Sequence, residues 1–296
     1  MLIDYFSLAH VIYILIALGF AAALYFILRK CSVGVQRAII LSLMLLNVIQ
    51  HLFKSYIYPQ YEGLGFNALN SAYNMCALLI LASPIAYLSR SERVRDFVFY
   101  TGSAAGIVAI LVPYWNIGDE MLSADVVRFF ICHLLLFASS ILTLLLGHHK
   151  PSWRSSYRIA AGFFISLVVI IFNDIVFLYM GLYPGVEVEN LFESLRAINP
   201  VWSFEPPEAF PFVADIAKFF SPDVFVGENR EGLFVPVLWY FIPIFLLISL
   251  LSLPITALID KENFLNDFKN VKSRVKNIVG KCKEILSRRN NSQSDE

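Results

Sequence analysis

Residues 8–28 read LAHVIYILIALGFAAALYFIL, an apolar stretch without any Asp, Glu, Lys or Arg. An α-helix needs about 20 such residues to cross the roughly 30 Å of hydrocarbon in a bilayer. The stretch follows Asp4 rather than a basic run, and no small-residue cleavage site follows it. A signal peptide carries a basic N-terminal run and a small-residue cleavage site, and this stretch has neither. The sequence therefore predicts a retained first transmembrane helix.

The composition of the whole chain extends this interpretation. Of its 296 residues, 58% are hydrophobic and 16% are charged, whereas soluble domains are about 45 to 50% apolar and about 25% charged. We therefore expect a multi-pass membrane protein. Its formal net charge of zero indicates no nucleic-acid partner, and its four cysteines are too scattered for a disulfide framework or a zinc site.

Seven apolar segments are long enough to be membrane spans, which predicts an all-α bundle of seven transmembrane helices over residues 1–259. They are Leu8–Leu28, Ala38–Ile57, Leu69–Leu88, Phe97–Pro113, Val126–Leu146, Ile159–Tyr183 and Leu233–Ile259. Most of the 23 Lys and Arg residues fall in the loops after the odd-numbered spans, the C-terminal segment included. Basic loops stay in the cytoplasm, so we expect the N-terminus outside, the C-terminus inside, and the plasma membrane rather than an internal one.

Two segments outside the spans have patterns of their own. The acidic, proline-rich connection at 184–231 is expected outside, where residues 212–220 could form an amphipathic helix, either as a lid or, as we favour, in a loop packed on helix ends. Residues 260–289 predict a basic amphipathic helix, and 290–296 a disordered tail. The apolar residues of the predicted 260–289 helix are separated alternately by 4 and 3 positions, which fits a coiled coil. We favour attachment to anionic lipid instead, because a basic helix just inside the last span gains about 1 kcal/mol per charge there.

Four polar residues lie within the predicted spans at nearly the same depth, roughly 9 to 14 Å below the outer edge at 1.5 Å per residue. They are His51, Cys76, His133 and Asp174. Ionisable groups in a membrane are costly and are usually paired or functional. We therefore expect them to line one pocket that opens toward the outer leaflet.

The second predicted span carries a polar stripe of Asn47, Gln50, His51 and Lys54, spaced so that all four share one helix face. The stripe must face the bundle interior or water, and the alternative to a binding role is hydrogen bonding between helices. Asp174 follows Asn173 in an apolar run and must bind a proton or find a donor, with His51 or Arg128 as candidate partners.

Cys76 is a candidate nucleophile because a histidine, His133, is predicted at matching depth, and an imidazole activates a nearby thiol. Cys132 precedes His133 in the sequence and is the rival thiol. On a helix its side chain points about 100° away from that of His133.

The stretches LNSAYNMC at 69–76 and FFICH at 129–133 resemble the bacterial YwaF-like membrane family and the related animal transmembrane protein 164 group, over about residues 35 to 255. The resemblance implies acyl transfer between glycerophospholipids, with Cys76 as nucleophile and His133 as base. The animal pattern Asn-Pro-Cys-His would instead put Ala72 at the nucleophile position, whereas the bacterial pattern Leu-Pro-x-x-Leu-Cys aligns Cys76.

The leading hypothesis is accordingly a membrane-embedded transferase or hydrolase, most like an acyltransferase, that acts on the acyl groups of phospholipid or lysophospholipid through a cysteine thioester, without metal or cofactor. Asp174 or Asn173 would orient the imidazole of His133. The remaining predicted substrate-binding residues are Asn47, Gln50, His51, Asn70, Asn74, Arg128 and Asn173. The alternatives are a non-catalytic lipid or small-molecule binding or transport protein, and a metal site made by His51, His133 and Asp174.

Overall fold

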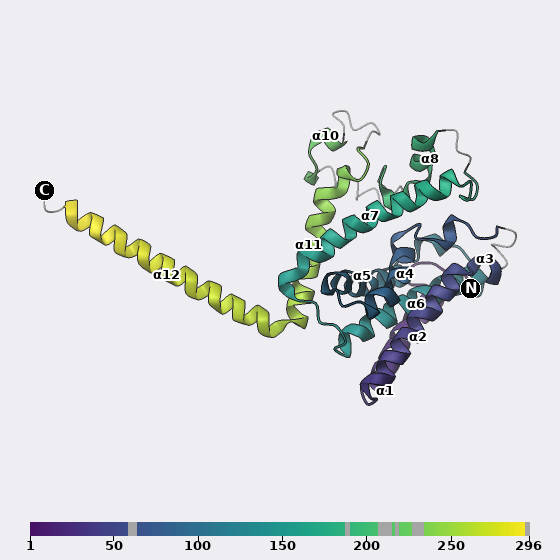
Figure 1. Cartoon of the computed structure of the whole chain (residues 1–296), viewed down its shortest axis with the longest axis horizontal. Coiled ribbons are helices and arrows are strands. Elements are labelled where there is room, and N and C mark those ends of the chain that lie inside the picture. The colour runs from purple at the N-terminus through teal and green to yellow at the C-terminus, as the bar shows by residue number, and fades with distance from the viewer. Residues whose placement is uncertain (59–63, 187–189, 207–214, 217–218, 227–233, 294–296) are drawn as a thin grey trace.

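The computed structural model describes residues 1–58, 64–186, 190–206, 215–216, 219–226 and 234–293, and side chains as far as residue 280 (Figure 1). Throughout this part of the chain the regular elements are helices, so the predicted all-α class is confirmed. Among the described residues, six helices are long and apolar enough to cross a membrane. They are α1 (Leu8–Leu28), α2 (Val33–Leu52), α5 (Glu92–Leu111), α6 (Ala124–Leu145), α7 (Ser156–Tyr179) and α11 (Leu238–Ile259).

The predicted third span differs from the structure at its start. We predicted a helix from Leu69, but α4 covers only Met75–Leu88, which is 14 residues or about 21 Å at 1.5 Å per residue. The side chain of Asn74 accepts a hydrogen bond from the backbone N–H of Ala77 at 2.8 Å and so caps the helix at this point. The 3-10 helix η2 (Ala68–Asn70) and a turn precede it.

The second predicted span is also interrupted, because α2 ends at Leu52 and the short α3 (Lys54–Ile57) begins after Phe53. Short helices occupy the described parts of the predicted outer connection: α8 (Leu191–Ile198), η5 (Pro200–Trp202) and α10 (Asp223–Val226). Leu195 packs against Leu178 of α7 and Val226 against Trp239 of α11, as in the packed-loop alternative. Of the predicted amphipathic helix at 212–220, residues 212–214 and 217–218 lie outside the described residues.

Helix α6 lies at the centre of the bundle and contacts α1, α2, α4 and α5. Helix α7 packs against α5 and α11 along one side, as Figure 1 shows. The main apolar core joins α2, α4, α5 and α6 through buried residues that include Met44, Ile80, Phe99 and Leu136. The two helices that carry the predicted third and fifth spans therefore share one packed interior.

Helices α5 and α6 approach closely at Gly106. A Cβ built on Gly106 would lie 2.7 Å from the backbone nitrogen of Phe137 and 2.9 Å from its Cα. Small residues allow such backbone approach in membrane bundles. The absence of a side chain at Gly106 therefore positions α6 against α5.

We expect Gly106→Ala to destabilise the purified protein by about 1–3 kcal/mol, the range for overpacking a tight contact. Gly19→Ala in α1 is the matched control, because a Cβ there meets no atom within 4 Å and alanine favours a helix over glycine. Denaturation in mixed detergent micelles, followed by circular dichroism, measures both. Equal stability of the two variants would contradict the close contact.

The bundle has two ends that differ in charge. Helices α1, α4, α6 and α11 finish at the same end, where α2, α5, α7 and α12 begin, and we call this the basic end. Its connections contain Arg29, Lys30, Arg90, Lys150 and Arg154. Helix α12 (Lys261–Gln293) starts there and projects away from the bundle (Figure 1). It runs past the predicted end at residue 289, and residues 294–296 lie outside the described chain.

Candidate functional site

A thiol–imidazole cluster lies at the end of the bundle opposite the basic end. Cys76 is in the first turn of α4 and is partly buried, whereas Cys132 and His133 are buried in α6. The imidazole of His133 interacts with two thiols. Cys132 Sγ lies 3.5 Å from Nδ1, and the thiol of Cys76 lies near enough to the same ring to interact with it electrostatically.

The orientation of His133 comes from its own helix. Its Nδ1 lies 2.8 Å from the backbone oxygen of Phe129, and since a carbonyl only accepts, Nδ1 carries the proton in this bond. The ring also packs against the Phe129 ring at 4.3 Å between centroids. Nε2 is then the nitrogen with a free lone pair, which is the chemistry required of a general base.

The predicted polar stripe of α2 and α3 faces the bundle interior, as expected. Asn47, Gln50, His51 and Lys54 are all at most 8% exposed. Asn47 donates from Nδ2 to the backbone oxygen of Cys132 at 2.9 Å, and its Oδ1 accepts from Gln50 at 2.8 Å. The helix-to-helix alternative is thus the observed role of Asn47, and it holds α2 against α6 beside the thiol cluster.

A second polar network centres on Ser71, in the turn before α4. His51 Nε2 donates to the backbone oxygen of Ser71 at 2.9 Å, and Asn173 Nδ2 donates to its hydroxyl at 2.8 Å. The His51 ring stacks on Tyr73 at 6.4 Å between centroids, and Lys54 Nζ lies 4.7 Å from the Tyr73 ring centroid. Helices α2, α3 and α7 thus hold the segment that leads to Cys76.

Asp174 belongs to this second network rather than to His133. Its Oδ1 accepts from Asn173 Nδ2 at 3.3 Å, and within the described chain its buried Oδ2 has no hydrogen-bond partner. The hydrogen bonds of the described residues include none from Asp174 or Asn173 to His133. The predicted orientation of the imidazole by Asp174 or Asn173 is therefore corrected: the backbone oxygen of Phe129 performs it. Arg128 pairs with Asp125 at 2.7 Å.

Two predicted substrate-binding residues have structural roles. Asn74 caps α4. Asn70 accepts from Ser55 Oγ at 2.8 Å and donates to the backbone oxygen of Leu52 at 3.0 Å, which ties η2 to the end of α2. The Asn74 side chain is occupied by the Ala77 N–H, and that of Asn70 by Ser55 and the Leu52 carbonyl. Asparagine competes well for backbone groups outside helices.

The metal alternative finds no support in the described ranges, where no group of three or more His, Cys, Asp or Glu side chains is placed to hold an ion. His51 and His133 belong to separate hydrogen-bond networks.

Sequence reasoning missed three contributors: Ser71, Tyr73 and Phe129. Phe129 had a local signal, since it lies four residues before His133, and a side chain can bond to the carbonyl one helical turn earlier. The role of Ser71 had no such signal, because its partners His51 and Asn173 come from distant helices. The role of Tyr73 likewise had no signal in the sequence, because it depends on η2 and the turn that interrupt the apolar run before α4.

The fold and this site define an all-helical, multi-pass membrane protein with an intramembrane thiol–imidazole pair. The sequence profile of the TMEM164 family matches residues 5–193. The chain therefore belongs to the TMEM164 family, which confirms the resemblance noted in the sequence, and the match includes Cys76, His133 and Asp174. Searches of curated proteins and of solved structures found no match.

Proposed function

We propose that this protein transfers acyl groups between glycerophospholipids through a thioester on Cys76, with His133 as general base. The observation that carries the proposal is the convergence of the Cys76 thiol from α4 and the His133 imidazole from α6, with Nδ1 of that imidazole bound to Phe129. A nucleophile next to a base that is oriented by a third group is the arrangement of covalent catalysis. Membership of the TMEM164 family supports it.

The first half-reaction forms the thioester. His133 Nε2 takes the Cys76 proton as the sulfur attacks the ester carbonyl carbon of a phospholipid. The carbonyl π electrons move to oxygen, and when they return the bond from carbon to the glycerol oxygen breaks. The imidazolium gives its proton to that oxygen, so a lysophospholipid leaves and the acyl group stays on Cys76.

The second half-reaction reverses these roles. The hydroxyl of a second lysophospholipid loses its proton to Nε2 and attacks the thioester carbonyl. The carbon–sulfur bond breaks, and the thiolate recovers the proton from His133. The free enzyme is regenerated, and no cofactor enters either step.

The start of α4 contributes to this chemistry in the proposal. Cys76 is in the first turn, where backbone N–H groups lack helical partners and the helix dipole is positive. No acidic residue lies in that turn to offset the field. These groups would stabilise negative charge on the sulfur or on the carbonyl oxygen of the tetrahedral intermediate.

We assign positioning roles to the Ser71 network. Asp174, Asn173 and His51 surround the turn that places Asn74 and Cys76, so they would act through the geometry of that turn rather than on the substrate. Asn47 would act similarly on Cys132 and His133 by fixing α2 to α6.

The direct test is to incubate purified protein in nanodiscs with a phospholipid bearing a labelled acyl chain. The expected result is label on Cys76 that neutral hydroxylamine removes, together with labelled product when lysophospholipid is added. Retention of the lipid without covalent label or turnover would refute the enzyme and favour a non-catalytic lipid-binding or transport protein.

We also propose that α4, extended by the turn before it, completes seven spans, with the N-terminus outside and the basic end in the cytoplasm of a plasma-membrane protein. The distribution of basic residues supports this orientation.

In intact cells, Glu205→Cys is expected to react with an impermeant thiol reagent and Ser273→Cys is not, in a background where Cys31 and Cys282 are serine. Both positions are in the described chain, on opposite sides in the proposed topology, and mass-tagging on gels measures the labelling. Reaction of Ser273→Cys alone would invert the orientation.

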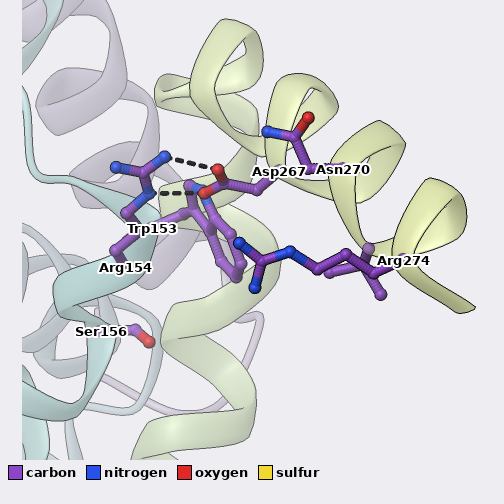
Figure 2. Close-up of a pocket in the computed structure, with 7 residues that line it drawn as sticks. Trp153, Arg154, Ser156, Asp267, Asn270 and Arg274 are labelled. Atoms are coloured by element: carbon purple, nitrogen blue, oxygen red, sulfur yellow. Dashed lines mark hydrogen bonds and ion pairs between the residues drawn. The ribbon is translucent and has the colours of Figure 1, made fainter. Parts of the chain in front are cut away.

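Helix α12 is anchored where it begins. The Arg154 guanidinium donates through two nitrogens to the Asp267 carboxylate (Figure 2), at 2.5 Å in each hydrogen bond. This hydrogen bond lowers the pKa of Asp267. Ser152 Oγ donates to Asp260 at 3.0 Å, and Trp153 packs edge-on against Phe264. The first turns of α12 are thereby held to the loop before α7.

Beyond this anchor, the apolar face of α12 is uncovered. Phe268, Val271, Val275 and Ile278 are each more than half exposed, with lysines and arginines between them. We propose that residues 264–289 lie on the anionic inner surface of the membrane, because apolar contact and basic charge act together there.

A peptide covering Asn263 to Arg289 is expected to become helical on vesicles that contain phosphatidylserine and to dissociate as salt rises, because its charges act through a potential screened within about 8 to 10 Å. Circular dichroism and vesicle sedimentation measure this. A peptide that stays unfolded on such vesicles contradicts the proposal, and a salt-insensitive dimer favours the coiled coil.

A further inference from the structure

A polar cavity at the basic end lies outside the thiol site. Its volume is about 410 Å³, and it is bounded by the start of α5, the loop between α6 and α7, and the first turn of α7. Pockets of roughly 300 to 1,000 Å³ accommodate small ligands. The walls carry the side chains of Arg95, Lys150 and Arg158 together with those of His148 and His149.

The charges in this cavity are not balanced. Of the two carboxylates on its walls, Glu92 is exposed, and Asp96 is already engaged, at 2.8 Å by His149 Nε2 and at 3.5 Å by Arg158 Nη1. With the Asp96–Arg158 pair set aside, two permanent cations, Arg95 and Lys150, face the single carboxylate of Glu92. Burial, with Arg37 and Arg95 nearby, lowers the pKa of His148, which is consistent with a positive local potential.

Several side-chain nitrogens of the residues that line the cavity are buried without a hydrogen-bond partner. Within the described part of the chain these include Arg95 Nε, Arg158 Nε and His148 Nε2. Buried polar atoms are normally satisfied, and an exception calls for an explanation such as an unseen ligand. The two guanidinium groups among them, which already bond to the His148 backbone oxygen and to Asp96, favour a further acceptor that carries negative charge.

The start of α7 adds to the same field. Ser155 and Arg158 line the cavity, and the first turn of this 24-residue helix has neither an acidic residue nor a side-chain cap. A helix N-terminus attracts phosphate through its free N–H groups and its dipole. It thus reinforces the guanidinium groups, which suit phosphate geometry.

From these observations, we infer that the cavity lined by Arg95, Lys150, Arg158 and His148 binds a phosphate-type oxyanion, supplied either by the headgroup of an anionic lipid or by a free phosphate. The site lies at the opposite end of the bundle from Cys76, so it is independent of the acyl chemistry proposed above.

The test uses the full-length protein and two probes. Inorganic phosphate is titrated into detergent-solubilised protein by calorimetry, and lipid retention is measured by native mass spectrometry from nanodiscs of phosphatidylcholine with a minority of phosphatidic acid. Saturable phosphate binding identifies a soluble source. Selective retention of phosphatidic acid identifies a lipid source, and binding of neither probe overturns the inference.

Lys150→Gln and Arg158→Gln are each expected to weaken binding at least about tenfold, the loss that accompanies removal of one charged hydrogen bond. Arg158→Lys keeps the charge but lacks the buried Nε donor, so it should fall in between. Arg93→Gln is the matched control, because it removes an exposed charge from the same helix end and Arg93 does not line the cavity.

Lys150 is exposed, so Lys150→Gln tests the site even if Arg158→Gln does not fold. Equal binding by Lys150→Gln and Arg93→Gln would overturn the site.

Discussion

Acyl transfer is expected to fall to the protein-free background when Cys76 is replaced by alanine, and to remain largely intact when Cys132 is replaced. In the proposed mechanism only the Cys76 sulfur forms the thioester, and a covalent catalyst has no alternative path once its nucleophile is removed. Cys132 Sγ contacts the His133 imidazole, and the Cys76 thiol lies near it. Comparing the two variants therefore distinguishes the thiol that reacts with the acyl group from a thiol that only lies close to the imidazole.

The measurement is the initial rate of labelled acyl transfer in nanodiscs at equal protein content. Cys76→Ser keeps the size of the side chain but is also expected to be inactive, because a serine hydroxyl is much harder to deprotonate than a thiol. Expression and gel-filtration profiles should match those of the parent protein. Full activity in Cys76→Ala, or its loss only in Cys132→Ala, would remove Cys76 from the mechanism.

The second large effect is expected at His133, where His133→Gln should lower the transfer rate by about 10²- to 10⁴-fold, the usual contribution of general acid–base catalysis. Glutamine keeps a polar side chain of similar length beside Phe129 but cannot take up a proton. The rate of His133→Gln should recover in part at alkaline pH, where hydroxide replaces the missing base.

His51→Gln is the matched control for this experiment. His51 is as buried as His133, at 7% exposed for each, but it bonds to Ser71 and not to a thiol. Its variant should lose less activity and show no recovery at alkaline pH. The same alkaline recovery in both variants, or in neither, would contradict a base role for His133.

The positions of most helices could be predicted from the sequence alone, because hydrocarbon selects for apolar length, which is a local property. Leu8–Leu28 was predicted to the residue, and the start of the third span was wrong by six residues. Counting apolar residues from Leu69 takes no account of the hydrogen bond by which Asn74 caps α4. It also takes no account of the hydrogen bond that holds Asn70 in η2.

The candidate site was likewise predictable only in part from the sequence. That His51, His133 and Asp174 are buried follows from the cost of leaving such groups in hydrocarbon, and the sequence was sufficient to predict it. Which of them meet was not predictable. Asp174 bonds to Asn173 rather than to His133. The rotation of each helix about its axis decides where a side chain points, and packing between distant segments sets that rotation.

The sequence by itself therefore determined an all-helical membrane protein, the pattern of its basic loops, and the set of intramembrane polar residues from which a site could be built. Only the tertiary structure decided that Cys76 starts a helix beside His133, that Phe129 orients the imidazole, and that Arg95, Lys150 and Arg158 enclose one cavity. The physical reason is that hydrophobicity acts along the chain, whereas hydrogen bonds and charge pairs act between groups that only the packing of helices such as α5 and α6 brings together.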